Sequence, residues 1–441
     1  MNAEPIGESR SVRRLALIVL LLNALSSILF IATVKRPVYD DPNNFPDVHR
    51  YASKGVSIET IRQHRNPTGP TSFLWMAAGV RIFGGDELRD ARIAALASWL
   101  ILGAAILLWG AKTSSPNLWY FALLVTLVFP HALTASATIL TEGPALLFAT
   151  LGVFFWLESI EQPSPSSRLF FQGIVGGLLI GIAITCRQYY LALLPAAVVL
   201  ACLRWRGNRA TRDSRWSLMI FLSLVSSILP VILLVVVWRG ISSPGMAAGA
   251  SYGNWKSGIG LNFTRPLVAA FYLAAYLLPL TFPAMTRLLL RQRLWAGVIA
   301  AAGAIAVALQ GPEFLQPGPL HSFVHSGSRM PHGELILLFA IAVVAIYNAV
   351  AVCFLLWEQR KSLTSSAPTS FALFTIAFFI AEQIGIGGNL PFYDRYVLQI
   401  APFLGLIAFA LFPRLTALRL FALAGLSVLS HFMLWRFAFG G

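Results

Sequence analysis

Residues 15–51 read LALIVLLLNALSSILFIATVKRPVYDDPNNFPDVHRY, an apolar run followed directly by a polar stretch rich in charged and turn-forming residues. The apolar run, residues 15–34, has about the 20-residue length that an α-helix needs to cross a membrane. The polar stretch extends to Arg92, where a second apolar run begins. Carboxylates gather in it although only 12% of the chain is charged. This pattern predicts a membrane helix followed by a long functional loop.

The rest of the chain repeats the apolar pattern. Hydrophobic residues make up 57% of the 441 residues, which is more than soluble domains carry. Apolar runs of roughly 17–25 residues recur along the whole length and predict an all-α membrane protein with about 13 spanning helices. One polytopic domain, residues 1–441, is the simplest organisation. The expected spans are 15–34, 92–111, 118–134, 143–157, 169–186, 188–203, 217–238, 266–286, 294–310, 335–357, 368–386, 396–412 and 420–437.

Basic residues of the short loops indicate the orientation. Most of them lie on the side of the N-terminus, which the positive-inside rule assigns to the cytoplasm. The loop 35–92 and the Gly/Pro-rich outer loops 239–265 and 311–334 then face the periplasm of a bacterial inner membrane, or the lumen of the ER in a eukaryote. Residues 57–63 and 71–83 predict short helices, the second an amphipathic one in the membrane interface. The net charge of +15 indicates topology signals and anionic lipids, not nucleic acid, because the arginines are spread over many loops.

Polar residues at the outer ends of the expected spans are the candidates for chemistry. A transferase with a lipid-phosphate sugar donor needs one carboxylate as general base and several cations that stabilise the departing phosphate. A glycosidase needs two opposed carboxyl groups instead. The first loop fits the transferase pattern, although Asp40-Asp41-Pro42-Asn43-Asn44 also reads as a solvated turn. Its candidates are Asp40, Asp41, His49, Arg50, His64 and Arg65.

Three further polar positions interrupt apolar runs. Glu142 begins one run, where it is either a functional membrane acid or a helix-capping carboxylate. Arg187 and Gln188 separate two runs; they face a cavity between spans, or Arg187 snorkels to the surface. Arg395 follows Asp394 and either binds phosphate or pairs with this aspartate to anchor the helix.

An outer loop rich in histidine raises the question of a metal site. Its spacing fits no strong ligand template, and we expect no metal there and no cofactor. The sequence leaves open whether the reaction needs a divalent ion. The residues concerned are Glu313, His321, His325, His332 and Glu334.

Together these stretches resemble the motifs of the GT-C superfamily, the polytopic glycosyltransferases that use polyprenyl- or dolichyl-phosphate sugars. Within it, the order of Asp41, Phe45, Tyr51, Gly55 and Arg187-Gln188 is similar to the dolichyl-phosphoglucose α-1,2-glucosyltransferase-like group. A departure is Pro42, because many relatives carry a second acid after the aspartate. The superfamily likeness is carried by Asp40-Asp41, by Asn66–Thr71 with Arg81–Gly85 and Ala91–Ile93, by Ala137–Glu142, and by Asp394–Tyr396 with Pro402.

The resemblance implies a GT-C-like helical fold whose long first outer loop covers the site with short helices. It implies transfer of a sugar from a polyprenyl-phosphate donor to a hydroxyl on a lipid, glycan or protein acceptor, with inversion at the anomeric carbon. Asp41 or Asp40 is then the base, and Glu142 orients the acceptor or assists the aspartate. The expected substrate-binding residues are Arg50, His64, Arg65, Arg187, Gln188 and Arg395.

Two other functions compete with the transferase. A transporter or flippase for a lipid-linked or anionic substrate also places arginines and acids inside a membrane, but the chain shows no convincing internal repeat. A non-catalytic scaffold would expose loop aromatics and need no cavity. The transferase requires Asp40 or Asp41, Glu142, Arg187 and Arg395 to converge on one outward-facing cavity.

Overall fold

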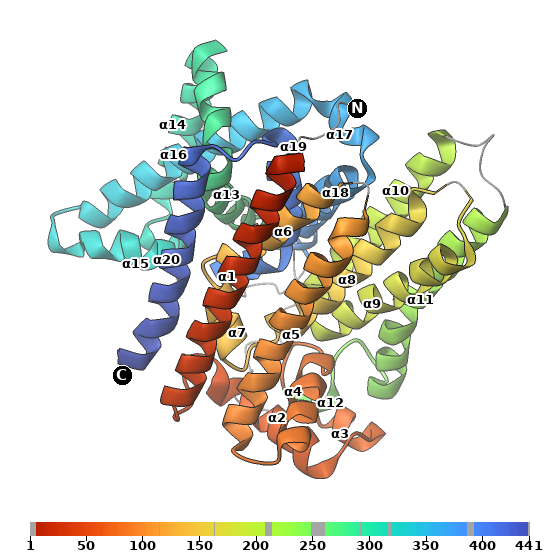
Figure 1. The fold of residues 1–441 in the computed structure, drawn as a ribbon. Helices are drawn as coiled ribbons and strands as arrows, with labels where there is room; N and C mark the ends of the chain where they lie inside the picture. Colours follow the sequence, from red (N-terminus) through yellow and green to blue (C-terminus); the bar gives the residue numbers. More distant parts are fainter. Residues whose placement is uncertain are drawn as a thin grey trace.

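The apolar runs fold into helices that lie side by side across the molecule (Figure 1). The structure is a computed structural model that describes residues 6–439 except 114, 163, 208–213, 248–260, 292, 316–318 and 386–391. Within these ranges all regular structure is helical, as the sequence predicts.

Nine helices of the described part are long and apolar enough to span a membrane, so the chain is a multi-pass membrane protein. The predicted span at 92–111 begins earlier than expected, because Asp86 caps the helix by accepting hydrogen bonds from the backbone N–H groups of Leu88 and Arg89. The nine spans lie in α1 (Ile6–Thr33), α5 (Glu87–Trp109) with η1 (Gly110–Lys112), α8 (Glu142–Ile160), α9 (Ser167–Cys186), η2 (Gln188–Ala192) with α10 (Leu193–Gly207), α11 (Ser214–Trp238), α13 (Thr264–Arg291), α16 (Gly333–Glu358) and α20 (Ala417–Phe439).

Four other predicted spans coincide with shorter apolar helices. Length alone does not make these helices membrane-spanning, so the total of 13 spans stays a prediction. They are α6 (Pro116–Val128), α14 (Arg293–Leu309), α18 (Ala367–Glu382) and α19 (Ala401–Leu411), the last preceded by the 3₁₀ turn η6 (Asp394–Ile400).

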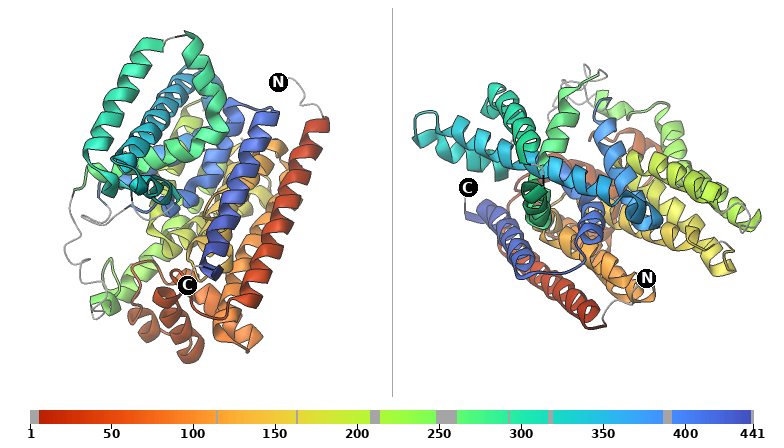
Figure 2. Two further views of the ribbon diagram at one scale, coloured as in Figure 1. Left: turned by 90° about the vertical axis from the view of Figure 1, so that its left-hand side faces the viewer. Right: turned by 90° about the horizontal axis from the view of Figure 1, so that it is seen from above.

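The first loop folds into three helices, α2 (Asp41–Lys54), α3 (Ile58–Arg62) and α4 (Thr71–Phe83). They gather at the end of the molecule opposite the N-terminus (Figure 1; Figure 2, left). The two predicted short helices correspond to α3 and α4, whereas the sequence did not indicate α2. Its Pro42 sits in the first helical turn, where a missing N–H is tolerated.

Helix α4 packs on protein with the face that was expected to lie in the membrane interface. Phe73, Met76 and Val80 are buried in a cluster that also contains Ala91 and Ala95 of α5. Burial of these side chains holds the loop firmly against α5. The interfacial position of α4 therefore stays a prediction.

A buried polar network ties the two halves of the loop together. Asp47 accepts hydrogen bonds from the backbone N–H of Asn66 at 3.0 Å and of Arg65 at 3.3 Å. Asn66 donates its side-chain N–H to Asn44 at 2.8 Å, and Asn44 donates to the Ile139 carbonyl at 2.6 Å. These bonds fix the segment that leads into α4 against the segment before α8.

The C-terminal end of α11 also contacts the loop. Arg62 donates to the Val237 carbonyl at 2.7 Å, and Trp238 donates from Nε1 to the Ile61 carbonyl at 3.1 Å. The predicted outer loop 239–265 contains the short helix α12 (Pro244–Ala247) and then continues into residues outside the described ranges.

Helices α14 and α16 lie on the side of the molecule opposite α9 and α11 (Figure 1; Figure 2, right). The second predicted outer loop, 311–334, contains η4 (Pro312–Phe314), α15 (Pro319–His325) and η5 (Ser326–Arg329). The remaining short elements are α7 (Ala132–Ala137) and α17 (Arg360–Ser365).

Candidate active site

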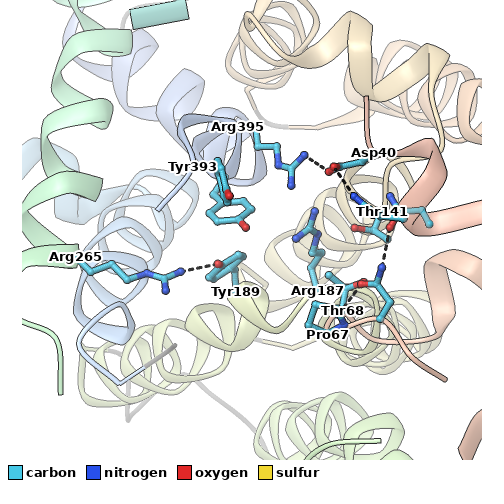
Figure 3. Close-up of a pocket in the computed structure, with 13 residues that line it drawn as sticks. Asp40, Pro67, Thr68, Thr141, Arg187, Tyr189, Arg265, Tyr393 and Arg395 are labelled. Atoms are coloured by element: carbon cyan, nitrogen blue, oxygen red, sulfur yellow. Dashed lines mark hydrogen bonds and ion pairs between the residues drawn. The ribbon is translucent and has the colours of Figure 1, made fainter. Parts of the chain in front are cut away.

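A polar cavity of about 220 Å³ lies where the first loop meets the ends of several helices (Figure 3). Among the described residues that line it, Asp40 is the only acid, and three arginines face the same space. The lining residues are Asp40, Asn43, Asn44, Asn66, Pro67, Thr68, Thr141, Arg187, Tyr189, Arg265, Tyr393, Arg395 and Tyr396.

The two neighbouring aspartates have different surroundings. Asp41 is fully buried and does not appear among the described lining residues of the cavity. Its carboxylate accepts hydrogen bonds from Arg92 Nη2 at 2.5 Å and from the backbone N–H groups of Ile139 at 2.6 Å and Val38 at 3.0 Å. Asp41 therefore joins the first loop to α5 and to the segment before α8.

Asp40 faces the cavity, with 25% of its side chain exposed. Its Oδ2 accepts a hydrogen bond from Arg395 Nη1, which lies on the far segment η6 (Figure 3). Tyr39 has a backbone φ of 57°, in the left-handed region that non-glycine residues seldom adopt. This turn precedes α2 and sends Asp40 and Asp41 to different partners.

Glu142 lies behind the cavity arginines, at the first turn of α8. Its Oε1 accepts a hydrogen bond from Arg187 Nη2 and lies 4.0 Å from Arg395 Nε. Glu142 is fully buried, and its Oε2 has no hydrogen-bond partner within the described residues. One carboxylate thus links two guanidinium groups from different parts of the chain.

Arg187 stands at the end of α9, in extended backbone with φ −146° and ψ 121°. The next residue, Gln188, donates to the Pro67 carbonyl at 2.7 Å, which brings the first loop to the cavity rim. A Cβ on Gly69 would lie 1.8 Å from the Thr185 carbonyl oxygen. Only glycine allows so close an approach of the loop to α9.

Tyrosines surround the arginines of the cavity. The Arg395 guanidinium carbon lies 5.3 Å from the ring centres of both Tyr39 and Tyr393. Arg187 lies 5.6 Å from the centre of Tyr396, close enough for a cation–π interaction. Burial raises the pKa of Tyr39 to about 12, so this phenol stays protonated at neutral pH.

Arg265 forms the far wall of the cavity, opposite Asp40 (Figure 3). It follows the first residue of α13 and is 3% exposed. Its Nη2 donates to Tyr189 Oη at 2.8 Å, and its Nε donates to Gln383 Oε1 at 3.1 Å. Arg265 and Tyr189 were not among the predicted site residues. The sequence does offer a signal for Arg265, because an arginine at the start of an apolar run is commonly functional.

The structure places the predicted binding residues of the first loop away from the described wall of the cavity, and their role in binding stays a prediction. Among the described lining residues of the cavity, Arg50, His64 and Arg65 do not occur. Arg50 donates to Asp47 at 2.5 Å, and the Arg65 side chain is exposed. His64 is fully buried, donates from Nε2 to the Thr68 carbonyl at 2.7 Å, and stacks near Trp238. Burial lowers its pKa.

In the described part of the histidine-rich loop, His325 Nδ1 pairs with Glu334 Oε1 at 2.7 Å. The rings of His321 and His325 stack with their centres 6.0 Å apart. Within the described part of the chain, no group of three or more His, Cys, Asp or Glu residues could hold a metal ion. The side chain of Glu313 lies outside the described residues.

No protein-family model matches the chain, and no curated protein matches it. Among solved structures, it is similar to ArnT from Cupriavidus metallidurans in the apo state, with 16% identity over 98% of this chain and 78% of that chain, and a TM-score of 0.41. The same protein bound to undecaprenyl phosphate gives 15% identity over 97% of this chain and 78% of that chain, and a TM-score of 0.39.

The oligosaccharyltransferase of Archaeoglobus fulgidus in its apo form is a further similar structure. It has 12% identity and a TM-score of 0.33, and the match covers 88% of this chain but only 56% of that chain. Both matches concern the fold alone. The likeness of the sequence motifs to the GT-C superfamily rests on those motifs. The narrower likeness to the dolichyl-phosphoglucose group stays a prediction.

Proposed function

We propose that this protein is a membrane glycosyltransferase that moves a sugar from a polyprenyl-phosphate donor to a hydroxyl group, on the periplasmic or lumenal side. The observation that carries the proposal is the charge pattern of the cavity, where one accessible carboxylate faces Arg187, Arg265 and Arg395. Base-assisted attack and departure of a phosphate need this combination.

Asp40 is the general base in this proposal. It is the only acid among the described lining residues, whereas the Asp41 carboxylate is occupied by Arg92 and two backbone N–H groups. The acceptor oxygen attacks the anomeric carbon from the face opposite the phosphate, which inverts this centre. Its proton passes to Asp40, while the bond from the anomeric carbon to the phosphate oxygen breaks and leaves its electron pair on the phosphate.

The three arginines stabilise the negative charge that builds up on the departing polyprenyl phosphate. Guanidinium groups bind phosphate through paired, charge-assisted hydrogen bonds and remain charged at any working pH. Because a phosphate monoester anion is a stable leaving group, no proton donor is needed. The arginines alone stabilise the departing phosphate in this proposal, which therefore includes no cofactor.

Arg395 changes partners during the reaction in this account. Without donor, its Nη1 donates to Asp40 and holds the base neutralised. A donor phosphate between Arg187 and Arg395 competes for the same guanidinium and frees an Asp40 oxygen for the acceptor hydroxyl. The base is then available only when the donor is in place.

Glu142 acts as a positioning residue. It is buried behind Arg187 and Arg395, so it holds the two guanidinium groups and does not touch the acceptor. Of the other predicted binding residues, Gln188 holds the Pro67 carbonyl at the rim. The sugar and the acceptor then contact Asn43, Thr68, Thr141 and the cavity tyrosines. The tyrosine rings can stack on a sugar.

Sugar transfer by the purified protein in lipid vesicles tests the proposal. Polyprenyl-phosphate hexoses and pentoses would be offered one by one with a mixed extract of lipid and glycan acceptors, with and without a chelator. We expect transfer from one donor class, unchanged by the chelator and about 10²–10⁴-fold slower in Asp40→Asn. If the folded protein transfers from no donor but moves a lipid-linked sugar across the vesicle membrane, the protein is a flippase instead.

A further inference from the structure

A second cavity lies at the other end of the helix bundle. Its volume is about 330 Å³, and it is enclosed by the end of α5, the end of α8 and the start of α9. Glu158 lines it and stands 16 residues along α8 from Glu142, which places this cavity about 24 Å from the candidate active site. The two cavities are therefore separate sites.

Three ionisable side chains face this cavity without pairing with one another. Lys112, Glu158 and Arg168 all line it, yet within the described residues none of them has an ion-pair partner. Glu158 is half-buried, and the carboxylate of Glu161 lies close enough to repel it. A carboxylate in this position is stabilised by a ligand that brings a cation.

The remaining wall is aromatic and reaches the surface. Trp109 is 41% exposed and packs edge-on against Phe155, with their ring centres 5.5 Å apart. Trp and Lys residues at the end of a spanning helix mark the boundary between the hydrocarbon layer and the headgroups. This cavity therefore opens at the level of lipid headgroups, on the membrane face opposite the first loop.

We propose that this cavity binds a phospholipid whose headgroup carries both a phosphate and a primary amine. Lys112 and Arg168 bind the phosphate, Glu158 accepts hydrogen bonds from the ammonium group, and the lipid chains leave past Trp109. The three unpaired charges in one cavity match the charges of such a headgroup. The site lies outside the proposed transfer reaction, and its occupancy does not depend on that reaction.

The side chains of the cavity distinguish this phospholipid from the other common phospholipids of a membrane. A trimethylammonium headgroup carries the same charge but cannot donate a hydrogen bond to Glu158. A headgroup with phosphate and glycerol brings no cation and leaves Glu158 facing an anion. The structure therefore favours phosphatidylethanolamine over phosphatidylcholine and phosphatidylglycerol.

Native mass spectrometry of the full chain, released from detergent with each of these three lipids bearing the same acyl chains, tests the proposal. We expect phosphatidylethanolamine to bind about tenfold more tightly than the other two, since a charge-assisted hydrogen bond has roughly this effect. Glu158→Gln should remove the preference, while Lys112→Gln and Arg168→Gln should weaken binding of all three lipids.

The control is Lys361→Gln, which removes an exposed cation at the start of α17, outside the cavity. It should leave all three affinities unchanged. Equal binding of the three lipids, a preference for phosphatidylglycerol, or an unchanged preference in Glu158→Gln would overturn the proposal. A loss of lipid affinity in Lys361→Gln as large as in Lys112→Gln would also overturn it, because binding would then depend only on the surface charge of the protein.

Discussion

Glu142 shows at the scale of single residues how a buried acid can act through its neighbours. It holds Arg187 by a direct hydrogen bond and lies 4.0 Å from Arg395. Glu142→Gln keeps the shape but removes the charge that orients both guanidinium groups. We expect the donor KM to rise about tenfold, as for loss of one charge-assisted contact, with a smaller fall in kcat.

Steady-state kinetics with varied donor check this prediction, and Glu59→Gln, an exposed change on α3, is the control. A fall in kcat at constant KM would instead give Glu142 a direct part in the chemical step.

His64 makes the stability of the first loop dependent on pH. Burial lowers its pKa in the folded protein, so the unfolded chain binds the proton more readily. The stabilisation is complete above the unfolded pKa of about 6.5 and is lost as the pH falls below it, by at most about 1.4 kcal/mol per pH unit. Of the charged groups that face His64, Asp47 raises its pKa and Arg50 lowers it.

Thermal unfolding in detergent between pH 8 and pH 5 measures this effect. The wild type should lose stability below about pH 6.5, and His64→Gln should show a shallower fall. Parallel curves for the two proteins would mean that His64 does not carry the pH dependence.

Residue assignments were predictable where burial makes a charge costly. Arg187 and Arg395 interrupt apolar runs and do line the cavity, because charges at membrane depth need a partner or a function. Asp40 and Asp41 could not be separated, since the backbone turn at Tyr39 sends them to different partners. The sequence also predicts that His64 and Arg50 bind substrate. Neither is among the described lining residues of the cavity, and sequence alone does not separate polar residues that build a loop from those that bind a ligand.

At the scale of elements, the docking of the first loop on α9 positions the cavity rim. Gly69→Ala would bring a methyl group into the Thr185 carbonyl and push the loop away. We expect a loss of about 1–3 kcal/mol in stability and reduced transfer. Gly425→Ala in α20, where a Cβ meets no atom within 4 Å, is the matched control.

Unfolding midpoints and transfer rates of the two variants provide the comparison. If Gly69→Ala behaves like Gly425→Ala, the loop is not seated on α9 as described.

The sequence predicts the spanning helices better than the helices of the first loop. Runs of apolar residues predicted the spanning helices, because backbone groups in lipid must bond within a helix. Helix α2 was not foreseen, since Pro42 and Pro46 favour turns. It is stabilised by packing of Val48 and Tyr51 and by long-range hydrogen bonds of Asn44 and Asp47. Tertiary contacts here outweigh local preference.

At the scale of the whole molecule, the orientation in the membrane decides which compartment supplies the substrates. The positive-inside rule predicts the first loop outside and α17 inside. With Cys202 and Cys353 replaced by serine, an impermeant thiol reagent on intact cells should label Ser53→Cys in α2 but not Ser362→Cys in α17. The reverse labelling pattern would place the candidate active site in the cytoplasm.

In the proposed reaction Asp40, and not Asp41, removes the proton from the acceptor. The direct measurement is the single-turnover transfer rate of wild type, Asp40→Asn and Asp41→Asn, each scaled to the amount of folded protein. We expect a loss of about 10²–10⁴-fold for folded Asp40→Asn. Asp41→Asn should lower the unfolding midpoint, because Arg92 loses a buried partner, yet keep most of its rate per folded molecule. A wild-type rate in Asp40→Asn would show that Asp40 is not the base.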